Sequence, residues 1–123
     1  MRLAFAIVAL AISAPAAAEW TKVHESEEGT SYVDPPTIRK EGATRQVWRL
    51  EDLRKAGSRG ERSVRAMTQY DCAAERQRIV TFTLHAGPMA KGKLLARQDP
   101  SGDWIYVAPN TAAAAVMRYV CGR

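Results

Sequence analysis

Two cysteines, Cys72 and Cys121, constrain the fold of this chain more than any other feature. Cys72 ends a segment, 63–72, in which apolar and polar side chains alternate, as they do in a β-strand with one face against a core. Cys121 ends a segment with the composition of a helix. Since two cysteines allow one intramolecular pairing, we expect a disulfide between this helix and the inner face of the strand. Closing a loop of this length stabilises a domain by about 4 kcal/mol in the chain-entropy model.

The first 18 residues predict a secretory signal peptide. Arg2 gives a positive start, Leu3–Ile12 is an apolar run, and Ala16–Ala18 is a small-residue cleavage motif of the A-x-A kind. We expect cleavage between Ala18 and Glu19. The alternative, a retained membrane anchor, is disfavoured because spanning a bilayer takes about 20 apolar residues. Residues 19–123 then form one domain.

Export determines the chemistry expected of the cysteines. An exported chain meets an oxidising environment, in which a disulfide between Cys72 and Cys121 persists. The alternative, a redox-active pair, lacks the C-x-x-C spacing that such chemistry usually shows. No cysteine follows the cleavage motif, so no lipid anchor is evident.

The remaining pattern predicts an α+β fold in which one helix covers one face of an antiparallel sheet. The helix begins at Asn110 or Thr111 as its cap and stops at Gly122. In the segment Thr44–Leu53, Trp48 and Leu50 lie on one side and the charged residues mostly on the other. Segment 54–62 is polar, contains two glycines and predicts a long hairpin loop. Strands are expected at 20–24, 30–33, 44–53, 63–72, 76–85, 93–97 and 103–107, and a single turn or short strand at 37–40.

No arrangement of residues predicts catalysis, a metal or a cofactor. His24 and His85 lack the ligand spacing of a zinc site, and no G-x-S-x-G elbow is present. The four aspartates at 34, 52, 71 and 103 could supply a general acid and base, but turn and strand-end roles explain each of them as well. We therefore expect a protein that is not an enzyme, with an unrecognised hydrolase as the alternative.

Five cations are the candidate ligand-binding residues. They lie in the hairpin loop and on the following strand: Arg54, Lys55, Arg59, Arg62 and Arg65. One interpretation is a solvated loop in a chain of net charge +5. The other is an electropositive patch for an acidic protein surface, an acidic glycan or a lipid headgroup phosphate. Nucleic acid is disfavoured because no stacking aromatics are interleaved with these cations.

The three tryptophans, Trp20, Trp48 and Trp104, allow two interpretations. A small domain needs large apolar side chains to build its core, which favours burial. An aromatic binding surface is the alternative. If one of them is exposed, Trp20 is the first candidate because it lies at the start of the processed chain.

Several short motifs, in this order and spacing, resemble the surface-adhesin protein E family of proteobacteria. They are Trp20, Tyr32–Asp34, Thr37–Arg39, Val47–Leu50, Ser63–Val64, Tyr70–Ala73, Met89–Gly92, Trp104 and Val120–Cys121. The resemblance covers nearly all of residues 19–123. It implies an antiparallel sheet of about six strands, with a C-terminal helix tied to its concave face by a disulfide.

The resemblance also implies a function. Family members are expected to bind host matrix and serum proteins such as vitronectin and laminin at the bacterial surface, and to form homodimers. The expectation is thus an exported, non-enzymatic, adhesin-like module of a Gram-negative cell envelope, with no transmembrane segment once the signal is removed. The alternative is a periplasmic structural or inhibitory module that is never displayed at the surface.

Overall fold

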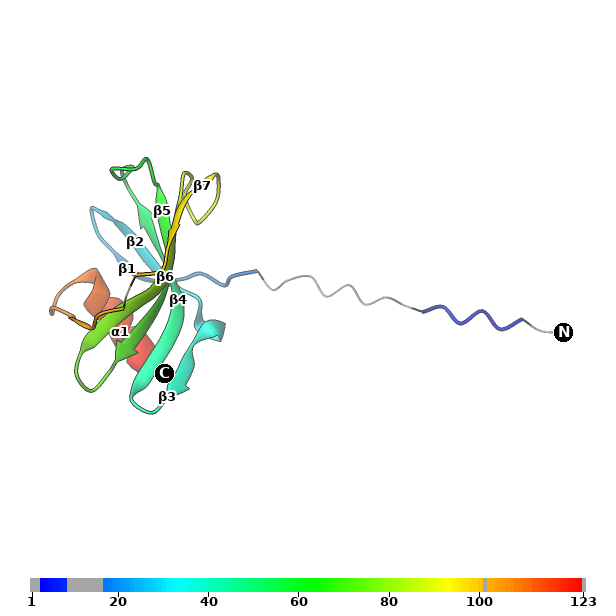
Figure 1. Cartoon of the computed structure of the whole chain (residues 1–123), viewed down its shortest axis with the longest axis horizontal. Helices are drawn as coiled ribbons and strands as arrows, with labels where there is room; N and C mark the ends of the chain where they lie inside the picture. The colour runs from blue at the N-terminus through cyan, green and yellow to red at the C-terminus, as the bar shows by residue number, and fades with distance from the viewer. Residues whose placement is uncertain (1–2, 9–16, 101, 123) are drawn as a thin grey trace.

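A computed structural model describes residues 3–8, 17–100 and 102–122 of the chain (Figure 1). Residues 1–2 and 9–16 of the expected signal peptide lie outside the described residues, and those that are described in this segment form neither helix nor strand. The elements are β1 (Thr21–Glu25), β2 (Gly29–Val33), a 3-10 turn (Pro35–Thr37), β3 (Arg39–Glu41), β4 (Thr44–Leu53), β5 (Ser63–Asp71), β6 (Arg76–His85), β7 (Leu94–Gln98), β8 (Ile105–Tyr106) and α1 (Ala112–Cys121).

All strands belong to one antiparallel sheet, which confirms the expected fold class. Six of them follow each other in the order β1-β2-β4-β5-β6-β7, and the short strands β3 and β8 pair with β4 and β6. Over the described residues the sheet therefore has eight strands, where the family resemblance implied about six. The two strands off the main order are short: β3 occupies the position expected for a turn or short strand, and β8 is two residues long within the expected range 103–107.

Helix α1 packs on one face of the sheet, where it contacts β1, β2 and β4 (Figure 1). Thr111 caps its first turn, since the hydroxyl accepts a hydrogen bond from the Ala114 amide, and Gly122 ends it. Four of its side chains are buried: Ala114, Val116, Met117 and Val120. They pack against Val33, Val47 and Tyr70 of the sheet. This side of the sheet is called the helix face below.

The expected disulfide joins Cys72 to Cys121 and fixes the end of α1 to the end of β5. The alternation in β5 also agrees with the prediction, since Ala66, Thr68 and Tyr70 are buried on the helix face. Arg65, Met67 and Gln69 point the opposite way. The side that they share with their partners on neighbouring strands is called the outer face.

Strand β4 presents its charged side, not its tryptophan, to the helix face. Val47 lies opposite Thr68, and Trp48 lies opposite Met67, so Trp48 and Leu50 belong to the outer face. Leu50 is nevertheless fully buried there. The sheet thus buries apolar residues on both sides, as strands in the middle of a sheet often do.

Two charged residues of β4 on the helix face, Arg49 and Glu51, belong to a connected polar network. The Arg49 guanidinium donates to a Glu51 carboxylate oxygen at 2.9 Å and to the Thr68 hydroxyl at 2.9 Å. The Ser31 hydroxyl donates to the other Glu51 oxygen at 2.7 Å. Because every charged member has a partner, the sheet tolerates these groups on a largely buried face.

Candidate binding surface

An arginine stacked on a tryptophan marks the outer face. The guanidinium carbon of Arg65 lies 3.7 Å from the centre of the Trp48 ring, within the range of a cation–π interaction. Burial lowers the pKa of Arg65, although the nearby Asp34 acts in the opposite direction. Arginine remains charged in proteins, so the stack holds a fixed cation on this face.

A second stack of arginine on tryptophan, formed by residues of β6 and Trp104, lies on the same face. Arg78 and Arg76 of β6 lie over the Trp104 ring at 4.3 and 5.1 Å. Arg76 also forms a salt bridge of 3.0 Å with Asp71, the residue directly opposite on β5. The Ala74 amide and Arg76 together lower the pKa of Asp71. Half of the arginine charge at this stack is therefore already neutralised.

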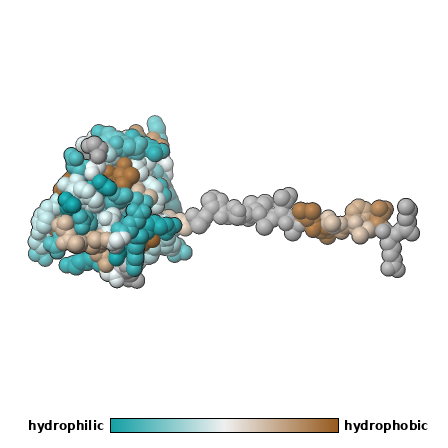
Figure 2. All heavy atoms as spheres, turned by 60° about the horizontal axis from the view of Figure 1, so that its bottom comes forward, coloured by the Kyte–Doolittle hydropathy of each residue, from teal (hydrophilic) through white to brown (hydrophobic). Residues whose placement is uncertain are grey.

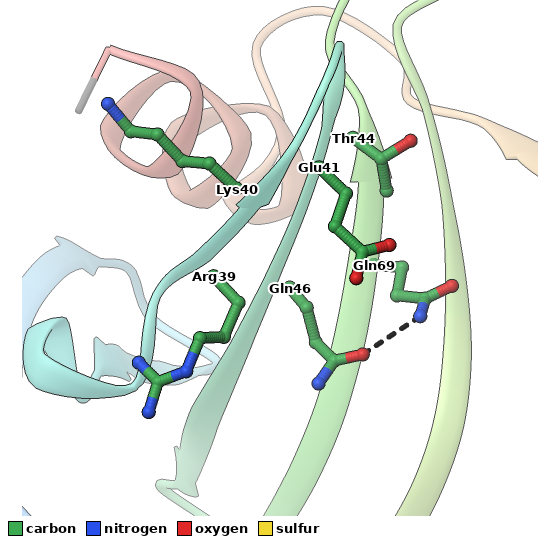
Figure 3. A pocket seen from close by; sticks show the side chains of 6 residues that line it. All are labelled: Arg39, Lys40, Glu41, Thr44, Gln46 and Gln69. Carbon is green, nitrogen blue, oxygen red and sulfur yellow. Dashed lines mark hydrogen bonds between the residues drawn. The ribbon is translucent and has the colours of Figure 1, made fainter.

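Two amide side chains, Gln46 and Gln69, connect the central strands on the outer face. Gln69 donates to Gln46 at 2.8 Å and accepts from Arg78 at 2.7 Å, across three adjacent strands. A shallow pocket of about 200 Å³ opens beside these amides (Figure 3). It is lined by Arg39, Lys40, Glu41, Thr44, Gln46 and Gln69. Figure 3 shows the carboxylate of Glu41 directed toward the paired amides and Lys40 directed away from them.

The hairpin loop occupies the predicted position between β4 and β5. Lys55 and Arg59 are exposed, and Arg62 is half-buried. The buried Nε of Arg62 has no hydrogen-bond acceptor within the described residues. Arg54 donates to the Ser26 carbonyl at 3.0 Å and lies 4.0 Å from a Glu25 carboxylate oxygen. Arg65, the fifth predicted residue, lies on the sheet itself and not in the loop.

An acidic turn lies against one side of the hairpin loop. Because β2 pairs with β4, the turn before Gly29 meets the loop after Leu53. Glu27 and Glu28 line the same hollow as Arg54 and Lys55. The structure therefore separates the predicted cations into two groups. Arg54 and Lys55 lie beside carboxylates, whereas Arg59 and Arg62 lie further along the loop and Arg65 lies over the Trp48 ring.

None of the three tryptophans is fully buried, and each is partly exposed. Trp48 and Trp104 are covered by guanidinium groups instead of a core. The stack of Arg78 on Trp104 was not predicted from the sequence. The two residues are far apart in the chain, and only the path of the chain between β7 and β8 brings them together. The alternation of arginines in β6 was the one available signal.

The histidines do not assemble a site. The Thr83 hydroxyl and the Nε2 atom of His85 are 2.8 Å apart, and burial lowers the pKa of His85. In the described ranges, no three of the histidine, cysteine, aspartate and glutamate side chains are grouped as metal ligands would be. Over the same ranges, no helix is long and apolar enough to cross a membrane.

The domain is a disulfide-stapled antiparallel sheet with a helix on one face and stacked arginines and tryptophans on the other. The chain belongs to the surface-adhesin protein E family, whose sequence profile matches residues 20–122. No curated protein matches the chain significantly.

Solved structures of protein E from Haemophilus influenzae have the same fold. One crystal form is 17% identical in sequence and superposes with a TM-score of 0.64, covering 94% of this chain and 96% of that one. Another structure of that protein is 16% identical with a TM-score of 0.63, covering 92% and 91%. A selenomethionine form gives 14% identity and a TM-score of 0.65, covering 82% and 85%. At this level of identity the similarity establishes the fold.

Proposed function

We propose that this protein is an exported, non-enzymatic binding module that attaches to acidic surfaces of host matrix or serum proteins. The contact is made by Arg59, Arg62 and Arg65 together with Trp48. Membership of a surface-adhesin family supports the function class. The observation that carries the site is the stacking of Arg65 on Trp48, which fixes a guanidinium on an otherwise regular sheet face.

Two physical arguments support this location. A stacked guanidinium has little side-chain freedom left to lose on binding, and tryptophan and arginine are among the residue types enriched at binding hot spots. Arg59 and Arg62 precede Arg65 along the same hairpin and strand, so that a partner with several carboxylates can reach all three. Arg54 and Lys55, the other two predicted residues, contribute less, because carboxylates of the acidic turn lie beside them.

Binding to immobilised vitronectin and laminin at several salt concentrations tests the proposal. We expect Arg59, Arg62 and Arg65 replaced together by Gln to weaken binding tenfold or more and to flatten its salt dependence. A matched control replaces Arg39, Lys40 and Arg118 by Gln, which removes the same charge from β3 and α1. Equal losses in both triple variants would contradict the proposed site, and no binding by the unmodified protein would contradict the proposed partners.

The alternative function is a periplasmic structural or inhibitory module. Protease added to intact cells distinguishes the two, with a known periplasmic protein as the control. We expect the protein to be cleaved from outside. Protection equal to that of the periplasmic control would favour the alternative and direct the search to periplasmic partners of the same surface.

A further inference from the structure

A buried carboxylate, Asp34, lies beside the bond at which the signal peptide is expected to be cleaved. Asp34 is 7% exposed and follows β2 directly. Its Oδ1 atom accepts a hydrogen bond of 3.2 Å from the backbone amide of Glu19, which is 15 positions earlier. The Asp34 carboxylate thus fixes the residue that follows the A-x-A motif in space.

This carboxylate lacks a charged partner in the uncleaved chain. Within the described residues, no lysine or arginine nitrogen lies within salt-bridge distance of Asp34. Arg65 of β5 is the cation that acts on it electrostatically, from further away. Buried carboxylates are usually paired with a cation, because leaving water costs a charge several kcal/mol. A neutral amide N–H meets this requirement only in part.

The segment before β1 has the properties of a removable leader. Residues 17–19 are exposed and lie in neither a helix nor a strand, so a protease can reach the bond after Ala18. The described apolar residues upstream pack against nothing: Leu3, Phe5 and Ile7 are all more than four-fifths exposed. Figure 2 shows them as an apolar stretch projecting from a largely hydrophilic domain. The segment leaves the domain on the side away from α1 (Figure 1).

We propose that cleavage after Ala18 creates a binding partner for Asp34: the α-ammonium group of Glu19 becomes the cation that this buried carboxylate lacks. Hydrolysis of the Ala18–Glu19 peptide bond leaves a carboxylate on Ala18 and an amine on Glu19, which takes up a proton at neutral pH. The nitrogen already lies 3.2 Å from Oδ1, so the ion pair forms without rearrangement. The processed chain is thereby latched to the domain at its first residue.

The ion pair between Glu19 and Asp34 can form only if cleavage occurs directly before Glu19. One residue of extended chain spans about 3.3–3.6 Å, so an N-terminus at Ala18 or Trp20 would place the ammonium group beyond direct contact with Asp34. It also predicts the sign of a pH effect. Pairing raises the pKa of the α-amine above its ordinary value of about 7.7–8.0. The added stability is present below that value and is lost as the pH rises through the raised pKa.

The first experiment determines the N-terminus. The full chain is exported in a Gram-negative host and the mature protein is analysed by intact mass and N-terminal sequencing. A single product beginning at Glu19 is expected. A product beginning at any other residue, or an uncleaved chain, overturns the proposal.

The second experiment tests the ion pair. A chain released to begin at Glu19 is compared with a matched chain that begins at Ala18, in thermal unfolding at pH 6.5. We expect the Glu19 chain to melt about 4 °C higher or more, and an NMR titration to show its α-amine pKa raised by about one unit, a tenfold change in proton affinity. Equal melting temperatures or an amine with its ordinary pKa would overturn the proposal.

Two modifications assign the effect to Asp34. Acetylating the Glu19 amine leaves the carboxylate in place and should remove the advantage over the Ala18 chain. Asp34→Asn should make the Glu19 and Ala18 chains equally stable. If the advantage persists in either case, the ammonium group acts through something other than Asp34, and the proposal fails.

Discussion

The disulfide between Cys72 and Cys121 should supply a large share of the stability of this domain. It closes a loop of sequence separation 49, which connects the end of β5 to the end of the terminal helix. In the chain-entropy model, a loop of this length raises the free energy of unfolding by about 4 kcal/mol. Domains of this size are stable by only about 5–15 kcal/mol in total.

The perturbation is the set of three variants Cys72→Ser, Cys121→Ser and the double substitution. Each single variant removes the bond completely, so each should lower the free energy of unfolding by about 4 kcal/mol. At about 4–8 °C for each kcal/mol, the melting temperature should fall by roughly 15–30 °C. The double variant should be no less stable than either single one, because no bond is left to lose.

Urea unfolding followed by circular dichroism, with and without a reductant, measures these differences. The reduced unmodified protein should match the double variant, which separates loss of the bond from the effect of serine at two partly buried positions. Losses that add in the double variant would show that the cysteines are not bonded to each other. A loss below about 1 kcal/mol would instead refute the loop-entropy reasoning and leave the packing of Val116, Met117 and Val120 as what holds the helix.

Three further predictions follow from single residues. Thr111→Ala should lower the free energy of unfolding by about 1 kcal/mol in urea melts, because the Ala114 amide loses its cap. The pKa of Tyr70 is raised by burial from 10.0 to about 12, so its absorbance titration should lag behind that of the other tyrosines. Stability should fall between these pH values, since the unfolded chain loses that proton first. Asp71 has a lowered pKa, so Asp71→Asn should cost stability above about pH 4, and the difference should shrink as the pH falls further.

The elements of this fold could be predicted from sequence because local signals agree with one another. The hairpin loop begins after Leu53 and ends before Ser63 in both the prediction and the structure. Two glycines and several charged residues in this segment favour an exposed loop over a strand or a helix. The helix likewise begins after a capping threonine and ends at a glycine. Gly60 has a φ of 83° that favours glycine, and Thr111 supplies the oxygen that caps the helix, so at these two places the residue type favours the observed backbone.

The sequence did not predict which side of β4 faces the helix. The alternation separated Trp48 and Leu50 from Arg49 and Glu51 correctly, but it carries no information about which side faces the helix. That choice depends on the register with β5, which places Arg49 opposite Ala66 and within hydrogen-bond distance of Thr68. A buried ion pair is not visible in a sequence until the residues that satisfy it are known.

The same limit applies to the proposed binding surface. Arg62 and Arg65 were predicted as candidates because they are close in sequence within one basic stretch. The acidic turn was also recognised in the sequence, but not that it lies beside Arg54. That proximity depends on the pairing of β2 with β4. Cations that are close in the sequence can lie apart on the folded sheet, and a binding partner responds to the charge distribution on the folded surface. The stacked Arg65 on Trp48 therefore locates the proposed contact better than the number of cations in the loop does.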